Sequence, residues 1–430
     1  MRSASTGVRV LQGRHVSRCD GELRTAWAPT APARTSLRVN PEATRQGRQR
    51  ARWRLASTTL HAPLVALAVL SRSRVPMSDS TFQWALIGPG SIAHRFADAV
   101  ARLDGCRLHA VCGRDAHRTR QFADRWSRPG DAAVLAHTDP AAVMSDPAVD
   151  GVYIATPHGQ HFDFALAALR AGKAVLCEKS LVPNLAMGQR LVEAARAHRV
   201  FLMEAVWTRF LPLYQDLGAW LREGRVGALR GMQSTFCFPA PYDPDSRIFS
   251  PALAGGALLD VGIYNLTATR WVLQHAVGEV PPLRDLQVHA KLAPTGVDAR
   301  LAVTLDFGDG LVSQFVCGID GYALNAMHIV GEHGAIILPE TFWEATRAQL
   351  LPARGTPETI ERPFEINGFE NEIREAMRCT RAGEIESPVV SHAETLAVLG
   401  WMDRIRALAG VKYPFDDDFP SPLPGHRPAD

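Results

Sequence analysis

The sequence predicts an α/β fold in which a mostly parallel sheet is followed by a region with a large, mostly antiparallel sheet. Short apolar runs alternate with amphipathic helical stretches over residues 82–205, which is typical of a parallel sheet with crossover helices. After Trp207, strand patterns follow one another with short turns and few helices. A chain of 430 residues with 46% hydrophobic and 21% charged side chains has room for two or three globular units.

Residues 1–76 differ from the rest of the chain. They hold 14 arginines, three acidic residues and no lysine, a net charge of +11 against −8 for residues 77–430. Because no hydrophobic period is sustained there, we expect a disordered arginine-rich extension, with the working protein starting at Met77. An organelle transit peptide and a nucleic-acid-binding arm are the alternatives. The expected division is 1–76, 77–206 for the first domain and 207–430 for the second.

Cysteine usage bears on metal binding and on compartment. The seven cysteines are scattered and contain no Cys-x-x-Cys pair, which argues against a zinc site and against a disulfide framework. We therefore expect no metal and a cytoplasmic protein. The apolar run at residues 64–70 is too short to span a bilayer, so a membrane is not an expected partner. The arginine-rich residues 1–76 lack the interleaved aromatic residues that base stacking needs, so a nucleic acid is not an expected partner either.

The first strand, residues 82–87, leads directly into a glycine motif. The motif is Gly88-Pro89-Gly90-Ser91-Ile92-Ala93, a G-x-G-x-x-A pattern that opens a helix to about residue 103. Gly88 permits the tight turn, Gly90 lets the backbone approach a pyrophosphate, and Ala93 lets the helix pack closely on the strand. The free N–H groups around Ser91 and Ile92 suit phosphate oxygens. This context predicts a Rossmann dinucleotide-binding domain.

The end of the second strand, residues 107–112, indicates which dinucleotide is bound. Arg114 and Arg118 lie four residues apart at a helix start, so both guanidiniums can reach one ligand. Two guanidiniums suit a 2′-phosphate, which favours NADP over NAD. NAD stays possible because Asp115 could hold the ribose hydroxyls instead.

Two further strands complete the expected nucleotide-binding crevice. Residues 149–155 end in a polar loop before a helix, and residues 173–177 end before a helix at 185–198 and a strand at 200–205. The carboxyl ends of parallel strands open toward one crevice. The remaining expected cofactor-binding residues are Thr156, Pro157, His158, His161, Glu178 and Lys179.

Lys179 is conspicuous because only four of the 47 basic side chains are lysine. An ammonium group can shift its own pKa or that of a neighbour, whereas an arginine stays charged. Lys179 is therefore a catalytic candidate, and the alternative is a strand-end lysine that reaches solvent.

The second domain is expected to be an α+β domain built on an open sheet. Its helices are predicted at residues 211–222, 258–274, 370–381 and 392–409. Its strands are predicted at 229–238, 286–292, 299–307, 311–318, 326–330, 335–338 and 342–351. A sheet face without cover predicts a homodimer or a higher homo-oligomer.

Asp260 and Tyr264 lie four residues apart on one predicted helical face among apolar residues. A tyrosine serves acid–base catalysis at neutral pH when a nearby cation lowers its pKa, and Lys179 is the expected cation. The alternative is a core tyrosine hydrogen-bonded to a helical aspartate.

The stretches at residues 88–93, 156–161, 177–179 and 260–264 together resemble the glucose–fructose oxidoreductase / inositol dehydrogenase / MocA (Gfo/Idh/MocA) family. The resemblance covers residues 82–415. Residues 204–210 and 260–264 are most similar to the branch of dimeric dihydrodiol dehydrogenases and NADP-dependent D-xylose dehydrogenases. Ser180 stands where the family usually has proline.

The resemblance implies a Rossmann domain joined to an open-sheet domain that often pairs through its sheet face. It implies catalysis by Lys179 and Tyr264, with Asp260 nearby. It also implies a substrate pocket lined by Trp207, Arg209, Phe236 and Phe238.

These observations predict an NADP-dependent oxidoreductase that transfers hydride between nicotinamide and a secondary alcohol or hemiacetal carbon. The expected substrate is a sugar or a cyclic trans-diol. A non-catalytic NADP-sensing regulator and a cofactor-retaining sugar oxidoreductase are the alternatives.

Overall fold

The computed structural model describes residues 81–128 and 130–419, so the expectations for residues 1–76 lie outside the described residues. The first sheet has six parallel strands in the order β3-β2-β1-β4-β5-β6, which is the Rossmann order and confirms the predicted fold of this part. Its strands are β1 (Phe82–Ile87), β2 (Cys106–Cys112), β3 (Leu135–His137), β4 (Gly151–Ile154), β5 (Ala174–Glu178) and β6 (Leu202–Ala205).

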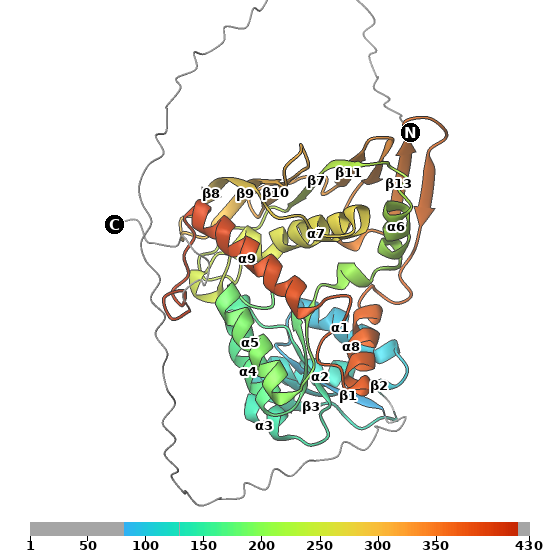
Figure 1. The fold of residues 1–430 in the computed structure, drawn as a ribbon. Coiled ribbons are helices and arrows are strands. Elements are labelled where there is room, and N and C mark those ends of the chain that lie inside the picture. Colours follow the sequence, from blue (N-terminus) through green and yellow to red (C-terminus); the bar gives the residue numbers. More distant parts are fainter. Residues whose placement is uncertain (1–80, 129, 420–430) are drawn as a thin grey trace, which may run out of the picture. The chain divides into compact units, whose positions relative to one another are not determined.

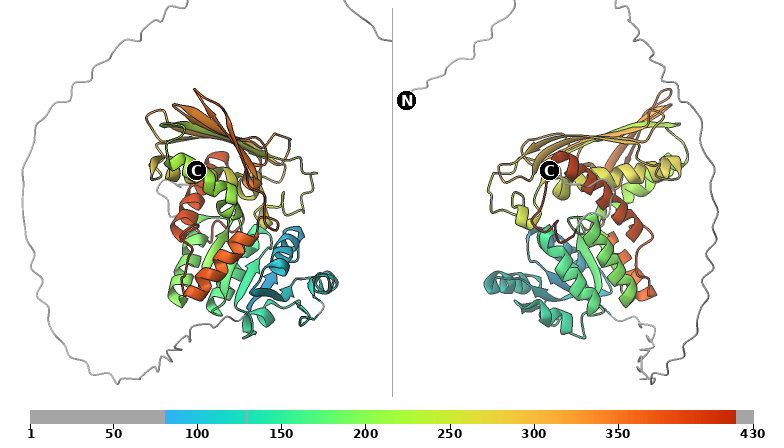
Figure 2. Two further views of the ribbon diagram at one scale, coloured as in Figure 1. Left: turned by 90° about the vertical axis from the view of Figure 1, so that its right-hand side faces the viewer. Right: turned by 60° about the vertical axis from the view of Figure 1, so that its left-hand side comes forward.

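Helices cover both faces of this sheet (Figures 1 and 2). On one face, α1 packs beside α2 and beside α8, a helix from near the end of the chain. On the other face, α4 packs beside α3 and α5. Their bounds are α1 (Ser91–Arg102), α2 (Ala116–Trp126), α3 (Pro140–Ser145), α4 (His161–Arg170), α5 (Leu185–His198) and α8 (Glu370–Ala382), with a short turn η1 (His158–Gln160) before α4.

The helix starts show how the sequence sets up the nucleotide edge. Asp115, Asp139 and Asn184 cap α2, α3 and α5 by accepting a backbone N–H with their side chains. The N-cap residue of α1 is Gly90, which has no side chain that could accept a backbone N–H. The first N–H groups of α1 are therefore left for a ligand.

The second sheet has eight strands in the order β14-β13-β12-β11-β7-β10-β9-β8. All its pairings are antiparallel except β7 with β10, which confirms the expected mostly antiparallel sheet. Its strands are β7 (Leu229–Cys237), β8 (Asp285–Leu292), β9 (Asp298–Asp306), β10 (Val312–Gly318), β11 (Met327–Gly331), β12 (Gly334–Leu338), β13 (Arg347–Pro352) and β14 (Glu358–Glu361).

A helical layer lies between this sheet and the first domain (Figure 1). Helix α7 packs against β7 and β10, and α6 packs on α7. The elements are η2 (Trp207–Phe210), α6 (Pro212–Arg222), η3 (Pro251–Leu253), the π-helical segment η4 (Leu258–Gly262), α7 (Ile263–Val277), η5 (Phe342–Glu344) and α9 (His392–Ala409).

One strand prediction was wrong. Residues 342–351 do not form a single strand, because Thr341 has a left-handed backbone (φ 39°) and Phe342–Glu344 then forms η5. Strand β13 begins only at Arg347. Strands β3 and β14 and helix α3 were not anticipated, since each is too short to show a hydrophobic period.

The last two helices bring the end of the chain back to the first domain. Helix α8 packs on α1, and the Arg381 side chain donates to the carbonyl of Gly105 (3.0 Å). Helix α9 contacts α5 and β6 as well as β8 of the second sheet. A boundary at residue 206 therefore separates the two sheets. It does not separate all the helices, because α8 and α9 follow this boundary in the chain and still pack on the first domain. No helix in the described part of the chain is long and apolar enough to cross a membrane.

Candidate active site

A cleft of about 1060 Å³ lies at the carboxyl ends of the first sheet and is bounded by the second domain. Such a volume suits a dinucleotide together with a small substrate. Most of the residues predicted from the sequence line it: Gly88, Gly90, Ser91, Ile92, Arg114, Arg118, Thr156, Pro157, His158, Glu178, Lys179, Phe236, Phe238, Asp260 and Tyr264.

The nucleotide edge of the cleft fits a pyrophosphate. Gly88 has φ +95°, and a Cβ there would lie 2.8 Å from the carbonyl carbon and oxygen of Ala155. A Cβ on Gly90 would meet nothing within 4 Å, so the backbone of Gly90 faces open space that a ligand can approach. The Thr156 hydroxyl is buried at this edge without a partner among the described residues. Ala93 is fully buried beneath the motif, where its small side chain lets α1 pack closely.

Arg114 and Arg118 lie exposed at the rim of the cleft. Within the described ranges, no carboxylate lies within ion-pair distance of either guanidinium. Asp115 accepts the backbone N–H of Arg118 (2.8 Å) and so caps α2. This bond and that of His117 hold the pKa of Asp115 below its usual value. The Asp115 carboxylate thus caps its own helix instead of facing a ribose. This favours NADP, whose 2′-phosphate Arg114 and Arg118 could bind, over NAD.

Two histidines fix the loop that follows β4. His161 does not line the cleft: it is fully buried, with Nδ1 2.9 Å from the Ser180 carbonyl and Nε2 2.8 Å from the Thr156 carbonyl. His158 lines the cleft, and burial lowers its pKa to about 3, so it is neutral at ordinary pH. His161 joins the ends of β4 and β5, whereas His158 offers an uncharged ring.

Lys179 and Asp260 meet across the two domains. The Lys179 ammonium donates to the Asp260 backbone carbonyl (2.5 Å) and lies 3.7 Å from its Oδ1. Arg247, from the loop after β7, donates to the same Oδ1 (2.9 Å). Burial acts to raise the pKa of Asp260, but the charges of Lys179 and Arg247 prevail and hold this pKa well below its usual value. Asp260 is therefore ionised.

Tyr264 lies at the inner wall of the cleft, and Trp207 donates its indole N–H to the Tyr264 hydroxyl (3.0 Å). The Lys179 ammonium lies 5.0 Å from the centroid of the Tyr264 ring, and no hydrogen bond joins the two side chains. Burial, followed by the charge of Glu178, raises the pKa of Tyr264 well above its usual value. The expected net lowering of this pKa by Lys179 is not met, because burial and the charge of Glu178 raise it.

The bend after β5 is held by two hydrogen bonds of Ser180. The Lys179–Ser180 peptide bond is cis. Ser180 donates its hydroxyl to the Leu259 carbonyl in η4 (3.1 Å), and its own carbonyl contacts His161. Serine therefore ties this bend to the segment that carries Asp260.

The substrate side of the cleft agrees with the expectation in part. Phe236 and Phe238 line it, and Phe236 stacks on Trp343 with ring centroids 3.4 Å apart. Trp207 is buried behind Tyr264 and does not line the cleft. Arg209 does not line it either, because its side chain donates to the Val389 carbonyl (3.3 Å) and lies 4.0 Å from Glu394.

Several cleft residues were missed by reasoning from the sequence. Arg247 lies in an irregular loop whose geometry no hydrophobic period reveals. Trp343 was hidden by the wrong strand prediction. Tyr322 and Leu324, 83% and 75% exposed, line the mouth of the cleft from the loop between β10 and β11.

A buried acidic cluster lies behind Lys179. Glu178 hydrogen-bonds the hydroxyl of Tyr153, and burial raises the pKa of Glu178. Glu372 on α8 is fully buried, and neither of its oxygens has a partner in the described part of the chain. Burial, with the charge of Glu178 added, raises the pKa of Glu372 well above its usual value. Burial without a hydrogen-bond partner therefore favours the neutral form of Glu372.

Replacing Glu372 with glutamine should stabilise the protein at pH 7–8. The pKa of Glu372 is higher in the folded protein than in the unfolded chain, so its contribution to stability declines as pH rises above the unfolded pKa. Glu372→Gln cannot ionise in either state. We expect a gain of about 1 kcal/mol or more in urea unfolding at pH 7–8, and a smaller gain at pH 4.5.

The matched control is Glu375→Gln on the same helix. Arg378 pairs with Glu375 (2.8 Å), and the pKa of Glu375 is lowered chiefly by this bond. This substitution should therefore lower stability at pH 7. Equal unfolding midpoints for Glu372→Gln and the unaltered protein at both pH values would contradict a raised pKa of Glu372.

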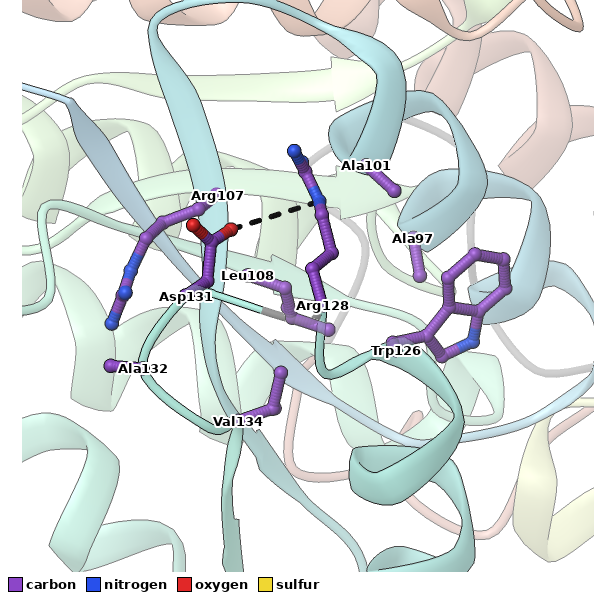
Figure 3. Close-up of a pocket in the computed structure, with 9 residues that line it drawn as sticks. All are labelled: Ala97, Ala101, Arg107, Leu108, Trp126, Arg128, Asp131, Ala132 and Val134. Atoms are coloured by element: carbon purple, nitrogen blue, oxygen red, sulfur yellow. Dashed lines mark ion pairs between the residues drawn. The ribbon is translucent and has the colours of Figure 1, made fainter.

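A second hollow in the first domain is too small to hold a ligand. Figure 3 shows the residues that line it, among them Trp126 and the ion pair between Arg128 and Asp131 (3.9 Å). Its volume of about 10 Å³ holds at most one water molecule. The chemistry is therefore expected in the large cleft.

Comparison with known proteins agrees with this geometry. Residues 82–206 match the oxidoreductase family with an NAD-binding Rossmann fold, and residues 214–337 match the GFO/IDH/MocA C-terminal domain. The chain belongs to the GFO/IDH/MocA family. As a member of this family it is an NAD(P)-dependent oxidoreductase, which confirms the resemblance seen in the sequence.

The chain matches two relatives over nearly their whole length. A trans-1,2-dihydrobenzene-1,2-diol dehydrogenase of Danio rerio is 33% identical over 342 residues, which is 78% of this chain and 98% of the relative. The Homo sapiens protein of the same name is 31% identical over 344 residues, again 78% and 98%.

Solved structures of the family share the fold. An aldose–aldose oxidoreductase from Caulobacter crescentus superposes with a TM-score of 0.67 at 22% identity, covering 77% of this chain and 98% of that one. A 3-ketoreductase from Actinomadura kijaniata in complex with NADP gives 0.66 at 23% identity, covering 76% and 98%.

Proposed function

We propose that this protein is an NADP-dependent dehydrogenase that oxidises a secondary alcohol or hemiacetal carbon of a sugar or a cyclic trans-diol. The observation that carries the proposal is that one cleft holds both the glycine motif at α1 and the trio of Lys179, Asp260 and Tyr264. The names of the relatives, dehydrogenases of a cyclic trans-diol, support this substrate class.

Tyr264 and Lys179 have different roles in the proposed reaction. Bound NADP⁺ supplies the hydride acceptor. The Tyr264 hydroxyl, at the inner wall, exchanges a proton with the substrate hydroxyl. The Lys179 ammonium supplies positive charge beside the Tyr264 ring and favours the oxyanion that forms as the substrate proton leaves.

Asp260 and the aromatic side chains position the substrate. The ionised carboxylate of Asp260 can accept hydrogen bonds from neighbouring hydroxyl groups of a polyol. Phe236 and Phe238 give the cleft an apolar wall that suits the faces of a sugar ring or a cyclic diol.

The proposal is tested by following cofactor reduction spectrophotometrically. Protein starting at Met77 is supplied with NADP⁺ or NAD⁺ and with a panel of aldopyranoses, polyols and cyclic trans-diols. Turnover of at least one member with NADP⁺ is expected. NADP binding without turnover of any member would favour a cofactor-sensing regulator instead.

Removing the two rim arginines should reduce the preference for NADP. Each charge-assisted contact to a phosphate contributes about 1.5–3 kcal/mol. We therefore expect the single variants Arg114→Ala and Arg118→Ala to raise KM for NADP⁺ roughly 10- to 100-fold and to leave KM for NAD⁺ nearly unchanged, as measured in steady-state kinetics.

Arg120→Ala is the matched control, because Arg120 is an exposed arginine of the same helix that does not line the cleft. It should leave both KM values unchanged. An equal rise of KM for NADP⁺ and NAD⁺ in the Arg114 and Arg118 variants would contradict recognition of the 2′-phosphate.

We propose a cytoplasmic homodimer or higher homo-oligomer. Six cysteines of the described residues are buried free thiols, which suits a reducing compartment. The helical layer lies on one side of the eight-stranded sheet, and its other side is the expected contact (Figure 2). Sedimentation analysis of the purified protein tests the oligomeric state.

A further inference from the structure

We propose that Trp207 is a positioning residue that holds the Tyr264 hydroxyl in place for proton exchange with the substrate, by donating its indole N–H to that hydroxyl. The inference rests on the proposed function. Among the described residues, the indole N–H of Trp207 makes the one hydrogen bond to this hydroxyl, at 3.0 Å. A bond from a fixed donor stabilises a tyrosinate more than a neutral tyrosine.

The donor lies behind the catalytic group and leaves the cleft side free. Tyr264 lines the cleft, whereas Trp207 does not and is 4% exposed. Trp207 thus acts on the hydroxyl without occupying the space of the substrate. An effect of Trp207 on turnover should therefore appear in kcat and its pH dependence, with KM unchanged.

The Trp207 ring is held in a slot formed by distant parts of the chain. The Arg95 guanidinium, from the nucleotide-binding helix α1, lies 4.4 Å from the ring centroid. Gly368 closes the slot from another side, because a Cβ there would lie 2.5 Å from the ring atom Cζ3. The Phe369 ring is 5.2 Å from the indole, centroid to centroid.

Arg95 is itself immobilised. It donates to the Asn367 carbonyl (2.7 Å) and to the Glu344 carboxylate (3.2 Å). The slot therefore connects the helix that receives the pyrophosphate with the donor that orients Tyr264. A tryptophan clamped in this way holds its N–H in one direction, which a hydrogen bond to a reacting hydroxyl needs.

The hydrogen bond from Trp207 opposes the effect of the negative charges around Tyr264 on the pKa of its hydroxyl. Burial, Glu178 on β5 and Asp260 on η4 act to raise the pKa of Tyr264. The Lys179 ammonium lies 5.0 Å from the ring. These three charged groups stay in place when Trp207 is changed, so a shift in the pH profile reports on the indole N–H.

The test compares Trp207→Phe with the unaltered protein, using the best substrate from the panel and NADP⁺. Phenylalanine keeps an aromatic ring in the slot but has no N–H. The acid limb of the kcat profile should move up by about one to two pH units, as expected for a hydrogen bond to a charged group. At pH 7, kcat should fall roughly 10- to 100-fold and recover at high pH.

Trp220→Phe is the matched control. Trp220 on α6 is 6% exposed, carries Arg225 5.1 Å from its ring and does not line the cleft. It should leave the pH profile unchanged. If Trp207→Phe does not fold, Arg95→Gln takes its place, because it removes the guanidinium that stacks on the Trp207 ring. This variant should shift the acid limb of the kcat profile in the same direction, by a smaller amount. Arg225→Gln, which removes the guanidinium beside Trp220, is its control.

The outcomes are distinct. If the unaltered protein is active and the acid limb stays in place in Trp207→Phe, or in Arg95→Gln where that is the variant used, the inference is overturned and the proposed function stands. A loss of kcat that is uniform across pH shows a purely structural role and also overturns it. If the unaltered protein oxidises no member of the panel, the proposed function and this inference both fall.

Discussion

Replacing Tyr264 with phenylalanine should lower kcat by about 10²- to 10⁴-fold while NADP still binds. The substitution removes one oxygen atom from the inner wall of the cleft and leaves the ring that packs near Phe236 (centroids 5.6 Å apart). The nucleotide motif lies on a different element, α1, so the dissociation constant of NADP, measured by fluorescence titration, should stay within a few-fold. A fully active Tyr264→Phe would end the proposed role.

Tyr214→Phe separates loss of chemistry from loss of packing. Tyr214 is also fully buried, and it donates its hydroxyl to the Phe342 carbonyl (2.8 Å) without lining the cleft. This control should cost about 1 kcal/mol of stability through the lost hydrogen bond and retain turnover. If both tyrosine variants lost activity equally, the effect of Tyr264→Phe would be structural.

Replacing Lys179 with methionine should also lower kcat by about 10²- to 10⁴-fold, because Lys179 is the cation beside the Tyr264 ring in the part of the chain that the structure describes. Arg247 remains paired with Asp260 (2.9 Å), so the carboxylate stays ionised in the variant. The loss should therefore come from the missing ammonium, and single-turnover measurements of hydride transfer at saturating NADP⁺ should show it. Unchanged single-turnover rates would contradict the assignment.

Lys173→Met is the matched control, because Lys173 precedes β5 just as Lys179 follows it. Its ammonium donates to the carbonyls of Asp146 (2.6 Å) and Val149 (2.9 Å), at the end of the sheet away from the cleft. We expect this variant to unfold more easily and to keep the kcat of the unaltered protein. A drop in kcat equal to that of Lys179→Met would mean that any lysine removed from this strand disturbs the site.

The sequence predicted features that depend on periodicity and on chain order. The helix over residues 392–409 has the predicted bounds, because its apolar period is long and Ser391 and Gly410 bracket it. Lys179 was placed in the cleft because residues that follow parallel strands share one edge of a sheet, whatever the packing around them.

The sequence could not predict the direction of side chains in irregular segments. Trp207 and Arg209 both lie in a short 3₁₀ turn and were expected to face the substrate. Instead, the Trp207 N–H reaches Tyr264 from behind, and Arg209 points toward Glu394. A four-residue 3₁₀ turn distributes its side chains in all directions, so their targets depend on distant elements that no local pattern specifies.

The electrostatics of Tyr264 could not be read from the sequence either. Lys179 was the visible cation, but burial and the Glu178 carboxylate on β5 raise the pKa of Tyr264, and burial depends on packing that no local pattern specifies. Glu372 shows no motif, and its burial beside Glu178 arises only because α8 returns to the first domain.

The return of α8 sets a constraint on protein engineering. Phe82 on β1 lies 5.9 Å from the guanidinium of Arg381, and the backbone N–H of Leu202 on β6 donates to the carbonyl of Ile385 (3.0 Å). A chimera joined only after residue 206 would pair a nucleotide-binding half with a foreign α8 and a foreign cover for β6. Exchanging cofactor specificity between relatives by recombination therefore needs two crossover points, with residues 370–392 travelling together with the N-terminal half.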